Sequence, residues 1–389
     1  MRHPISILLL VLGIVSLPQT SFSQEFVEKI TNFFEFSINK KAVAQDSTLF
    51  PNKVVLAPVA NYEPATSLGF GIGAKFLFKL KGSGPETRTS NLPASLVYTL
   101  NNQFIFFSGY TVFFNQEKYL LKGNLIFSKY PISYFGIGSR SEERGALEIS
   151  YDQVLVEPLL LKKVAKDLFI GGGIRYNAIV NTRLNEAFGS LPEGTSLQDS
   201  LGSTSSGLEL AITYDSRDNV LNAFKGNFLE FTHGFYGEVA GGTNRFMLSK
   251  LDFRQYIQLH PQKLNSLALQ WYTRFSWGDT PPLELSALGG PELLRGFQEG
   301  RFRDKIAFFA QAEYRWQALE RIGFVFFGGM GDVVNDLGDT QFSNMKYSVG
   351  AGFRLKIVKS ENLNIRFDIA QGLGPNRDRN FYLGIAESF

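Results

Sequence analysis

The sequence predicts an all-β protein, a transmembrane antiparallel β-barrel of about sixteen strands in a bacterial outer membrane. Three features predict this fold: apolar and polar residues alternate along many segments, a secretory leader opens the chain, and an aromatic residue, Phe389, ends it. From 346 to 357, for example, every odd position is apolar and every even position is small or charged. A strand with that alternation presents one face to lipid and the other to water.

The composition excludes several other classes of protein and site. The chain has 389 residues, of which 44% are hydrophobic and 14% aromatic. Beyond the leader there is no apolar run of about 18–20 residues, which excludes a helical membrane protein. The absence of cysteine excludes disulfides, thiolate metal ligands and cysteine nucleophiles. A net charge of +3 is too small to indicate a nucleic-acid partner.

Residues 1–23 are predicted to be a signal peptide. Arg2 precedes an apolar stretch over 5–17 that is too short to span a bilayer, and Ser21-Phe22-Ser23 gives a cleavage site. Residues 24–52 lack strand alternation. They are predicted to form a short periplasmic segment, either one amphipathic helix or an irregular lead-in.

Residues 53–389 are predicted to form the transmembrane barrel. An even strand number suits a closed bacterial barrel, and closure is needed because an open edge in lipid leaves backbone groups unpaired. The predicted strands are 53–61, 66–81, 92–100, 103–114, 118–128, 144–163, 166–183, 205–215, 226–237, 243–259, 264–277, 304–317, 321–333, 346–358, 361–372 and 379–389.

Charged side chains fall on one face of these strands. In 361–372, Phe367 points to lipid, whereas its neighbours Arg366 and Asp368 point inward. A cation on the lipid face near the bilayer midplane costs about 2–4 kcal/mol, so the sorting has a strong physical cause. The lumen is therefore predicted to be polar, with charges of both signs.

The strand count also predicts the orientation. Both termini of an even-stranded barrel lie in the periplasm, where the connections are short, and the longer loops lie outside. The long stretches 129–143, 184–204 and 278–303 fall outside under this rule. The longest of them, 278–303, is the sixth external loop.

The sixth loop has the most distinctive sequence. Gly289, Gly290 and Pro291 set specific backbone turns rather than a loose loop. Arg295 beside Gly296 offers a rigid fork of five donors that can tie the loop tip to acidic groups in the lumen.

The tetrad Leu294-Arg295-Gly296-Phe297 resembles the signature of the BamA/TamA-like outer-membrane assembly barrels, the bacterial surface antigen family. The resemblance implies that the loop folds back into the lumen and that its arginine meets acidic side chains on the next two strands. The segment Tyr214-Asp215-Ser216-Arg217-Asp218-Asn219 also looks like this family, and the likeness covers roughly 53–389.

Two positions specify the expected partners of the arginine. In Glu313-Tyr314-Arg315 the resemblance implies that Glu313 pairs with Arg295. On the following strand the family has an aspartate where this chain has Gly329, so one of the two anchors is expected to be missing. Assembly members also carry periplasmic POTRA domains, for which residues 24–52 are too short, so a barrel-only member is expected.

The last strand looks like the β-signal that barrel-assembly machinery reads in its clients. Phe381, Leu383, Ile385 and Phe389 are predicted to lie on one lipid-facing side. The seam between the first and last strands is predicted to be weak. Pro58 lacks a ladder donor and Gly384 has no side chain to pack.

Nothing in the sequence indicates a catalytic residue, a cofactor or a metal site. The predicted mature chain has two histidines, His233 at a lipid-side position near one membrane edge and His260 in a turn. Two histidines without a clustered third ligand do not make a metal site. The protein is therefore predicted not to be an enzyme and not to bind nucleic acid.

Two functional classes remain open. The first is a barrel that aids insertion or translocation of outer-membrane client proteins by opening sideways at the seam. The second is a passive pore or structural barrel in which the loop limits conductance. Outer-membrane lipids and the barrel-assembly machinery, as its own insertase, are the expected partners in either case.

Overall fold

A computed structural model gives the architecture. It describes residues 35–38, 50–63, 67–84, 86–100, 103–140, 146–184, 201–261, 263–374 and 379–389. The predicted signal peptide, 1–23, and residues 26–34, whose apolar spacing suggested the helix, lie outside these residues. Within 24–52, the described residues Glu35–Ser37 form a strand rather than a helix.

The elements of the N-terminal half are β1 (Glu35–Ser37), β2 (Lys53–Glu63), β3 (Ser67–Phe78), β4 (Ser90–Thr99), β5 (Phe104–Phe114), β6 (Tyr119–Tyr134), β7 (Leu147–Val156), β8 (Leu159–Ala165), β9 (Leu168–Leu184) and β10 (Ser203–Asp215). Those of the C-terminal half are β11 (Gly226–Tyr236), η3 (Glu238–Ala240), β12 (Phe246–His260), β13 (Lys263–Gly278), η4 (Pro282–Glu284), β14 (Ser286–Leu288), β15 (Phe302–Asp304), β16 (Ile306–Gln317), β17 (Ile322–Val334), η5 (Leu337–Asp339), η6 (Phe342–Asn344), β18 (Lys346–Val358), β19 (Leu363–Leu373) and β20 (Arg379–Ile385).

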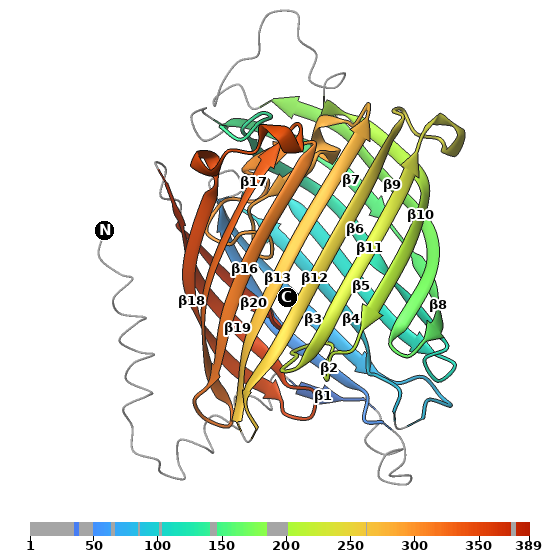
Figure 1. The fold of residues 1–389 in the computed structure, drawn as a ribbon, viewed down its shortest axis with the longest axis vertical. Helices are drawn as coiled ribbons and strands as arrows, with labels where there is room; N and C mark the ends of the chain where they lie inside the picture. The colour runs from blue at the N-terminus through green and yellow to red at the C-terminus, as the bar shows by residue number, and fades with distance from the viewer. Residues whose placement is uncertain are drawn as a thin grey trace, which may run out of the picture.

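The strands wind into one tilted antiparallel barrel (Figure 1). β7 and β8 pair with the same two neighbours, β6 and β9, and act as one strand interrupted at Pro158. Counted in this way, and with β1 set aside, the described strands of the wall number sixteen. The predicted fold class is confirmed. Short β1 pairs with β2, with Glu35 opposite Val55.

The alternation of faces follows the sequence. Leu208 and Leu210 are 64% and 59% exposed on the outside of β10, whereas Asp368 on β19 is fully buried inside. One deviation occurs at the end of β18, where a bulge shifts the register between Lys356 and Val358. The bulge brings Ile357, expected on the lipid face, into a buried apolar cluster.

The two ends of the barrel differ. The turn end carries short connections such as 115–118, 318–321 and 359–362, and the loop end carries the long connection 279–305. None of the described residues belongs to a helix that is both long and apolar enough to cross a bilayer. Within the long connection, β14 and β15 form a small hairpin ladder of their own.

The wall closes where β20 lies beside β2. Paired registers join the other neighbouring strands, and β18 is matched with β19 from Tyr347 to Val358. Within the described residues no such register joins β20 to β2. Ile385, at the end of β20, instead reaches the inner side of β3, and a Cβ built on Gly73 would lie 3.5 Å from its Cδ1.

Candidate functional site

The loop between β13 and β16 enters the barrel and holds a fixed backbone. Gly289, Gly290 and Gly296 have φ values of 109°, 101° and 111°, and Leu294 has a φ of 67°. A Cβ on Gly296 would lie 2.7 Å from the backbone carbon of Gln371, so a glycine is required there. The tetrad 294–297 is buried. The predicted folding of loop 278–303 into the lumen is therefore confirmed.

Arg295 is the most deeply buried charge of the loop, with 1% of its surface exposed. Its Nη2 donates to Glu313 on β16, and its Nη1 donates to Oδ2 of Asp368 on β19 at 2.8 Å. The guanidinium lies over the ring of Phe327, 3.5 Å from its centroid. Two carboxylates and one aromatic face thus surround a cation that has little contact with water.

The expectation that Arg295 has a single carboxylate anchor is wrong. Gly329 does stand where the second acid was sought, and a Cβ there would lie 3.2 Å from Cδ1 of Leu294. The missing side chain makes room for the tetrad's own leucine. Asp368, two strands farther along, supplies the second anchor. The alternation in the sequence predicts that Asp368 points inward, but it does not give the position of Asp368 along the barrel axis relative to Arg295.

The same carboxylates bind two further arginines. Oε2 of Glu313 accepts from Nη2 of Arg315 at 2.9 Å, and Oδ1 of Asp368 accepts from Nη1 of Arg354 at 2.5 Å. Both pairs are buried, so each carboxylate lies between a guanidinium of the loop and one of the wall. Charge-assisted hydrogen bonds of this kind are among the stronger polar contacts in proteins.

These wall arginines reach the end of the chain. Arg315 donates from Nη2 to the backbone oxygen of Phe389 at 2.8 Å, and Arg354 donates from Nε to Glu387 at 2.7 Å. Ser388 donates to the carbonyl of Pro291 in the loop at 3.0 Å. The loop and the C-terminal residues 386–389, called the tail below, therefore form one polar network inside the lumen.

The predicted lipid-facing position of Phe389 is wrong. β20 ends at Ile385, and Ala386 has a φ of 79°, which ends the alternation. Phe389 is 7% exposed and packs with Ala223, Tyr256 and Ala268 inside the barrel rather than facing lipid. Phe381 remains on the outside, 51% exposed. Figure 1 shows the C-terminus within the outline of the barrel.

Side chains of β20 also hold the tip of the loop. The backbone amide of Gly296 donates to the hydroxyl of Tyr382 at 3.0 Å, and Asn380 donates from Nδ2 to the carbonyl of Gly296 at 3.0 Å. Gly384 faces inward, and a Cβ there would lie 3.1 Å from Nε of Arg366. Pro58 lies on β2, on the other side of the closure. The loop is thus anchored on the strand that borders the seam.

A second segment crosses the lumen at the turn end. Between β10 and β11, Asn219 donates to the carbonyl of Glu361 and Asn222 to that of Asn362, each at 3.1 Å. These carbonyls belong to the turn between β18 and β19, so residues 216–225 reach another part of the wall. The sequence singled out the first part of this segment only through a family resemblance. No periodicity marks the crossing.

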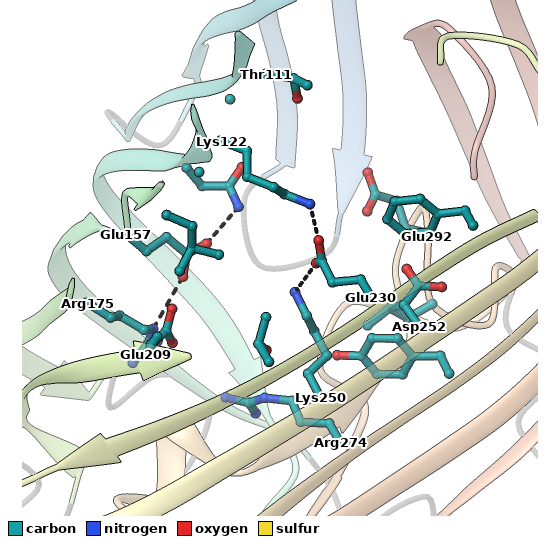
Figure 2. Close-up of a pocket in the computed structure, with 18 of the residues that line it drawn as sticks. Thr111, Lys122, Glu157, Arg175, Glu209, Glu230, Lys250, Asp252, Arg274 and Glu292 are labelled. Atoms are coloured by element: carbon teal, nitrogen blue, oxygen red, sulfur yellow. Dashed lines mark hydrogen bonds and ion pairs between the residues drawn. The ribbon is translucent and has the colours of Figure 1, made fainter. Parts of the chain in front are cut away.

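A polar cavity of about 480 Å³ lies beside the loop, which lines it with Glu292 and Leu293. Figure 2 shows Glu230 of β11 between Lys122 of β6 and Lys250 of β12. Arg175 of β9 pairs with Glu157 at 3.3 Å and with Glu284 of the loop at 2.9 Å. The cavity wall therefore carries charges of both signs that largely neutralise one another.

His233 and His260 take no part in the site. Nδ1 of His233 contacts the hydroxyl of Ser249 at 2.6 Å, and its ring packs edge-on against Phe235. His260 is the last residue of β12, at the turn end.

Comparison with known proteins identifies the family. Residues 70–389 match the Omp85 superfamily domain, so the chain belongs to the Omp85 superfamily and is an outer-membrane β-barrel. A search of curated proteins found no match.

Two solved structures share the fold. BamA from Haemophilus ducreyi lacking POTRA domains 1–3 is similar with a TM-score of 0.55 and 14% identity, over 86% of this chain and 70% of that one. CdiB from Acinetobacter baumannii is similar with a TM-score of 0.56 and 14% identity, over 86% of this chain. The alignment spans 59% of the CdiB chain.

Proposed function

We propose that this Omp85-superfamily barrel aids the insertion or translocation of outer-membrane proteins by opening between β2 and β20. The observation that carries the proposal is the closure itself, where no paired register joins the described residues of the two strands. A ladder supplies backbone hydrogen bonds at each pair of residues, so a wall separates most easily where the ladder is absent. An exposed strand edge is then a template for an incoming client strand.

The loop network fits the role of a lock beside that seam. Arg295 is held by two buried carboxylates, and Gly296 is held by Tyr382 and Asn380 of β20. Any outward movement of β20 must therefore break contacts with the loop. We propose that the loop end faces outside and that both termini lie in the periplasm, because bacterial barrels carry their short turns on the periplasmic side.

We also propose that β20 is the signal by which assembly machinery inserts this chain. Phe381 is 51% exposed, and Leu383 lies opposite the outward-facing Phe367, as a lipid-facing signal strand requires. Ile385, predicted on the same face, instead packs against a buried apolar cluster. The inward position of Phe389 belongs to the folded barrel, whereas a signal is read before folding. We assign residues 1–23 to a signal peptide that directs export.

The test is a lock across the seam in this cysteine-free chain. Cysteines at Val59 and Leu383, which line a common cavity, are bridged by a reducible bifunctional thiol reagent in proteoliposomes, and insertion of a co-diluted unfolded outer-membrane barrel is followed by protease protection. We expect insertion after the bridge is reduced and none while it is intact. The control joins Val349 to Gln371, which are partners in the β18–β19 ladder and should not affect insertion.

Insertion that is unaffected by the seam lock would contradict sideways opening. The second candidate, a passive pore, is favoured by the polar cavity of about 480 Å³ in the lumen. A pore would conduct ions whether the seam is locked or not, and deletion of 294–297 would raise its conductance. Client insertion would be absent in every state.

A further inference from the structure

A second cavity, of about 390 Å³, lies between the inner face of β5–β7, the tip of the loop and β20. We call it the chamber. Its β5–β7 side carries apolar and aromatic residues where other inward positions carry charges. The residues on that side include Ile105, Phe107, Ile126, Tyr130, Ile132 and Tyr151. Phe107 also borders the polar cavity, so the two spaces adjoin.

The chamber reaches the seam. Asn380 and Tyr382 line it from the inner face of β20, where they also hold the loop. Phe381 and Leu383 line it too, although Phe381 is 51% exposed on the outer face. Val59 of β2 completes this side. The chamber therefore borders both strands of the seam, β2 and β20.

Two buried guanidinium groups border the chamber with unsatisfied donors. Arg303 and Arg366 are each 8% exposed. Arg303 donates from Nη1 to the carbonyl of Pro282 at 3.2 Å, but its Nε has no partner. Within the part of the chain that the structure describes, no carboxylate oxygen lies within 4 Å of Arg303.

Arg366 is also incompletely satisfied. Its Nη1 has no hydrogen-bond partner, and the nearest carboxylate oxygen, Oδ2 of Asp368, is 3.7 Å away. That oxygen already accepts from Arg295 at 2.8 Å. Among the described residues, Glu299 is the one carboxylate that lines the chamber, against two arginines. A buried cation whose donors are incompletely satisfied is costly, so the chamber favours an anion.

We propose that the chamber binds a single-chain amphiphile with an anionic head group, which enters from the bilayer through the seam. The alkyl chain lies against the apolar side of β5–β7, and the carboxylate or phosphate lies between Arg303 and Arg366. The volume is within the range of about 300–1,000 Å³ found for small-molecule sites. This binding goes beyond the proposed assembly function and needs no client protein.

The test uses light-activated probes in phosphatidylcholine liposomes that contain the full-length chain. The probes are a diazirine-labelled palmitate, a labelled lysophosphatidylglycerol and a labelled lysophosphatidylcholine, and cross-linked residues are mapped by mass spectrometry. We expect both anionic probes to label the inner residues around Phe107 and Ile126. The zwitterionic probe should label outer residues such as Phe231 and Phe253 alone. Stronger labelling by palmitate or by the lysophosphatidylglycerol identifies the head group.

Two variants separate binding from folding. Arg303→Gln with Arg366→Gln should reduce inner labelling by about tenfold or more, because each charge-assisted bond supports the head group. Ile126→Trp should abolish inner labelling by filling the chamber while both charges remain. Arg321→Gln, at the turn end, is the matched control and should change nothing. Heat-modifiable gel mobility shows which variants retain the folded barrel.

Labelling of the outer face alone by all three probes would overturn the proposal. So would equal inner labelling by the zwitterionic probe, because the arginines would then select nothing. Inner cross-links to a photoactivatable peptide with a client strand sequence, with no inner labelling by lipid, would assign the chamber to clients instead.

Discussion

Replacing Arg295 with alanine should release the loop from the lumen. The cation is 1% exposed and contacts both Glu313 and Asp368. Breaking a buried pair by removing one partner costs about 3–5 kcal/mol when the remaining charge is isolated. Here each carboxylate retains a second guanidinium, from Arg315 or Arg354, so we expect a lower cost of about 2–4 kcal/mol.

External proteolysis measures this release. A glutamate-specific protease is suitable because its sites at Glu292 and Glu299 are the same in parent and variant. When opening is fast relative to cleavage, the cleavage rate follows the open population. A change of 2–4 kcal/mol therefore corresponds to about 30- to 1,000-fold faster cutting, at about 1.4 kcal/mol for each factor of ten.

Two control variants make the result specific. Arg295→Lys keeps the charge but loses the planar fork, so its cleavage should be intermediate. Arg140→Ala removes an exposed arginine from another connection at the loop end and should leave cleavage unchanged. Cleavage of Arg295→Ala at the parental rate would refute the reasoning, because a fully buried cation with two carboxylate partners would then contribute nothing to docking.

Three further predictions concern the loop and residues 216–225. Gly296→Ala should speed cleavage of the loop as much as Arg295→Ala does, since its Cβ would clash with the β19 backbone; an unchanged rate would contradict the close approach. Asn219→Ala with Asn222→Ala should raise single-channel conductance of a loop-deleted barrel further, because residues 216–225 still cross the turn end; equal conductance would show that this segment does not occlude. Burial alone would raise the pKa of Glu284, but Arg175 lowers the pKa below its ordinary value. The stabilisation is then complete above the unfolded pKa and lost as pH falls through the folded one, so protease resistance measured at pH 5 should equal that at pH 7 and decline only in stronger acid.

The strands of the barrel wall were predictable because the pattern that specifies them is local in the sequence. Each residue of a strand must face lipid or lumen, and a charge on the wrong side is expensive. The alternation in 361–372 therefore placed Phe367 outside and Asp368 inside without knowledge of any neighbour. Strand ends were less certain, since a bulge such as that after Lys356 depends on the partner strand.

The contents of the lumen were predictable only in part. The family resemblance at 294–297 implied a tucked loop and named Glu313 as the partner of Arg295. The sequence could not identify Asp368 as the second partner. Alternation shows that a residue points inward, but not whether it lies at the same level along the barrel axis as Arg295. The inward turn of the tail depends on the left-handed backbone conformation of one residue, Ala386, and no sequence periodicity predicts it.

The oxygens of the two carboxylates are divided between the loop and the tail. Glu313 uses Oε1 for Arg295 and Oε2 for Arg315, and Asp368 uses Oδ2 for Arg295 and Oδ1 for Arg354. Departure of the loop breaks the hydrogen bond from Ser388 to Pro291 but none to the wall arginines that hold Phe389 and Glu387. It also removes the repulsion between Arg295 and these two arginines. The tail should thus stay in the lumen when the loop leaves, and the sideways opening that we propose would require a second event that releases the tail.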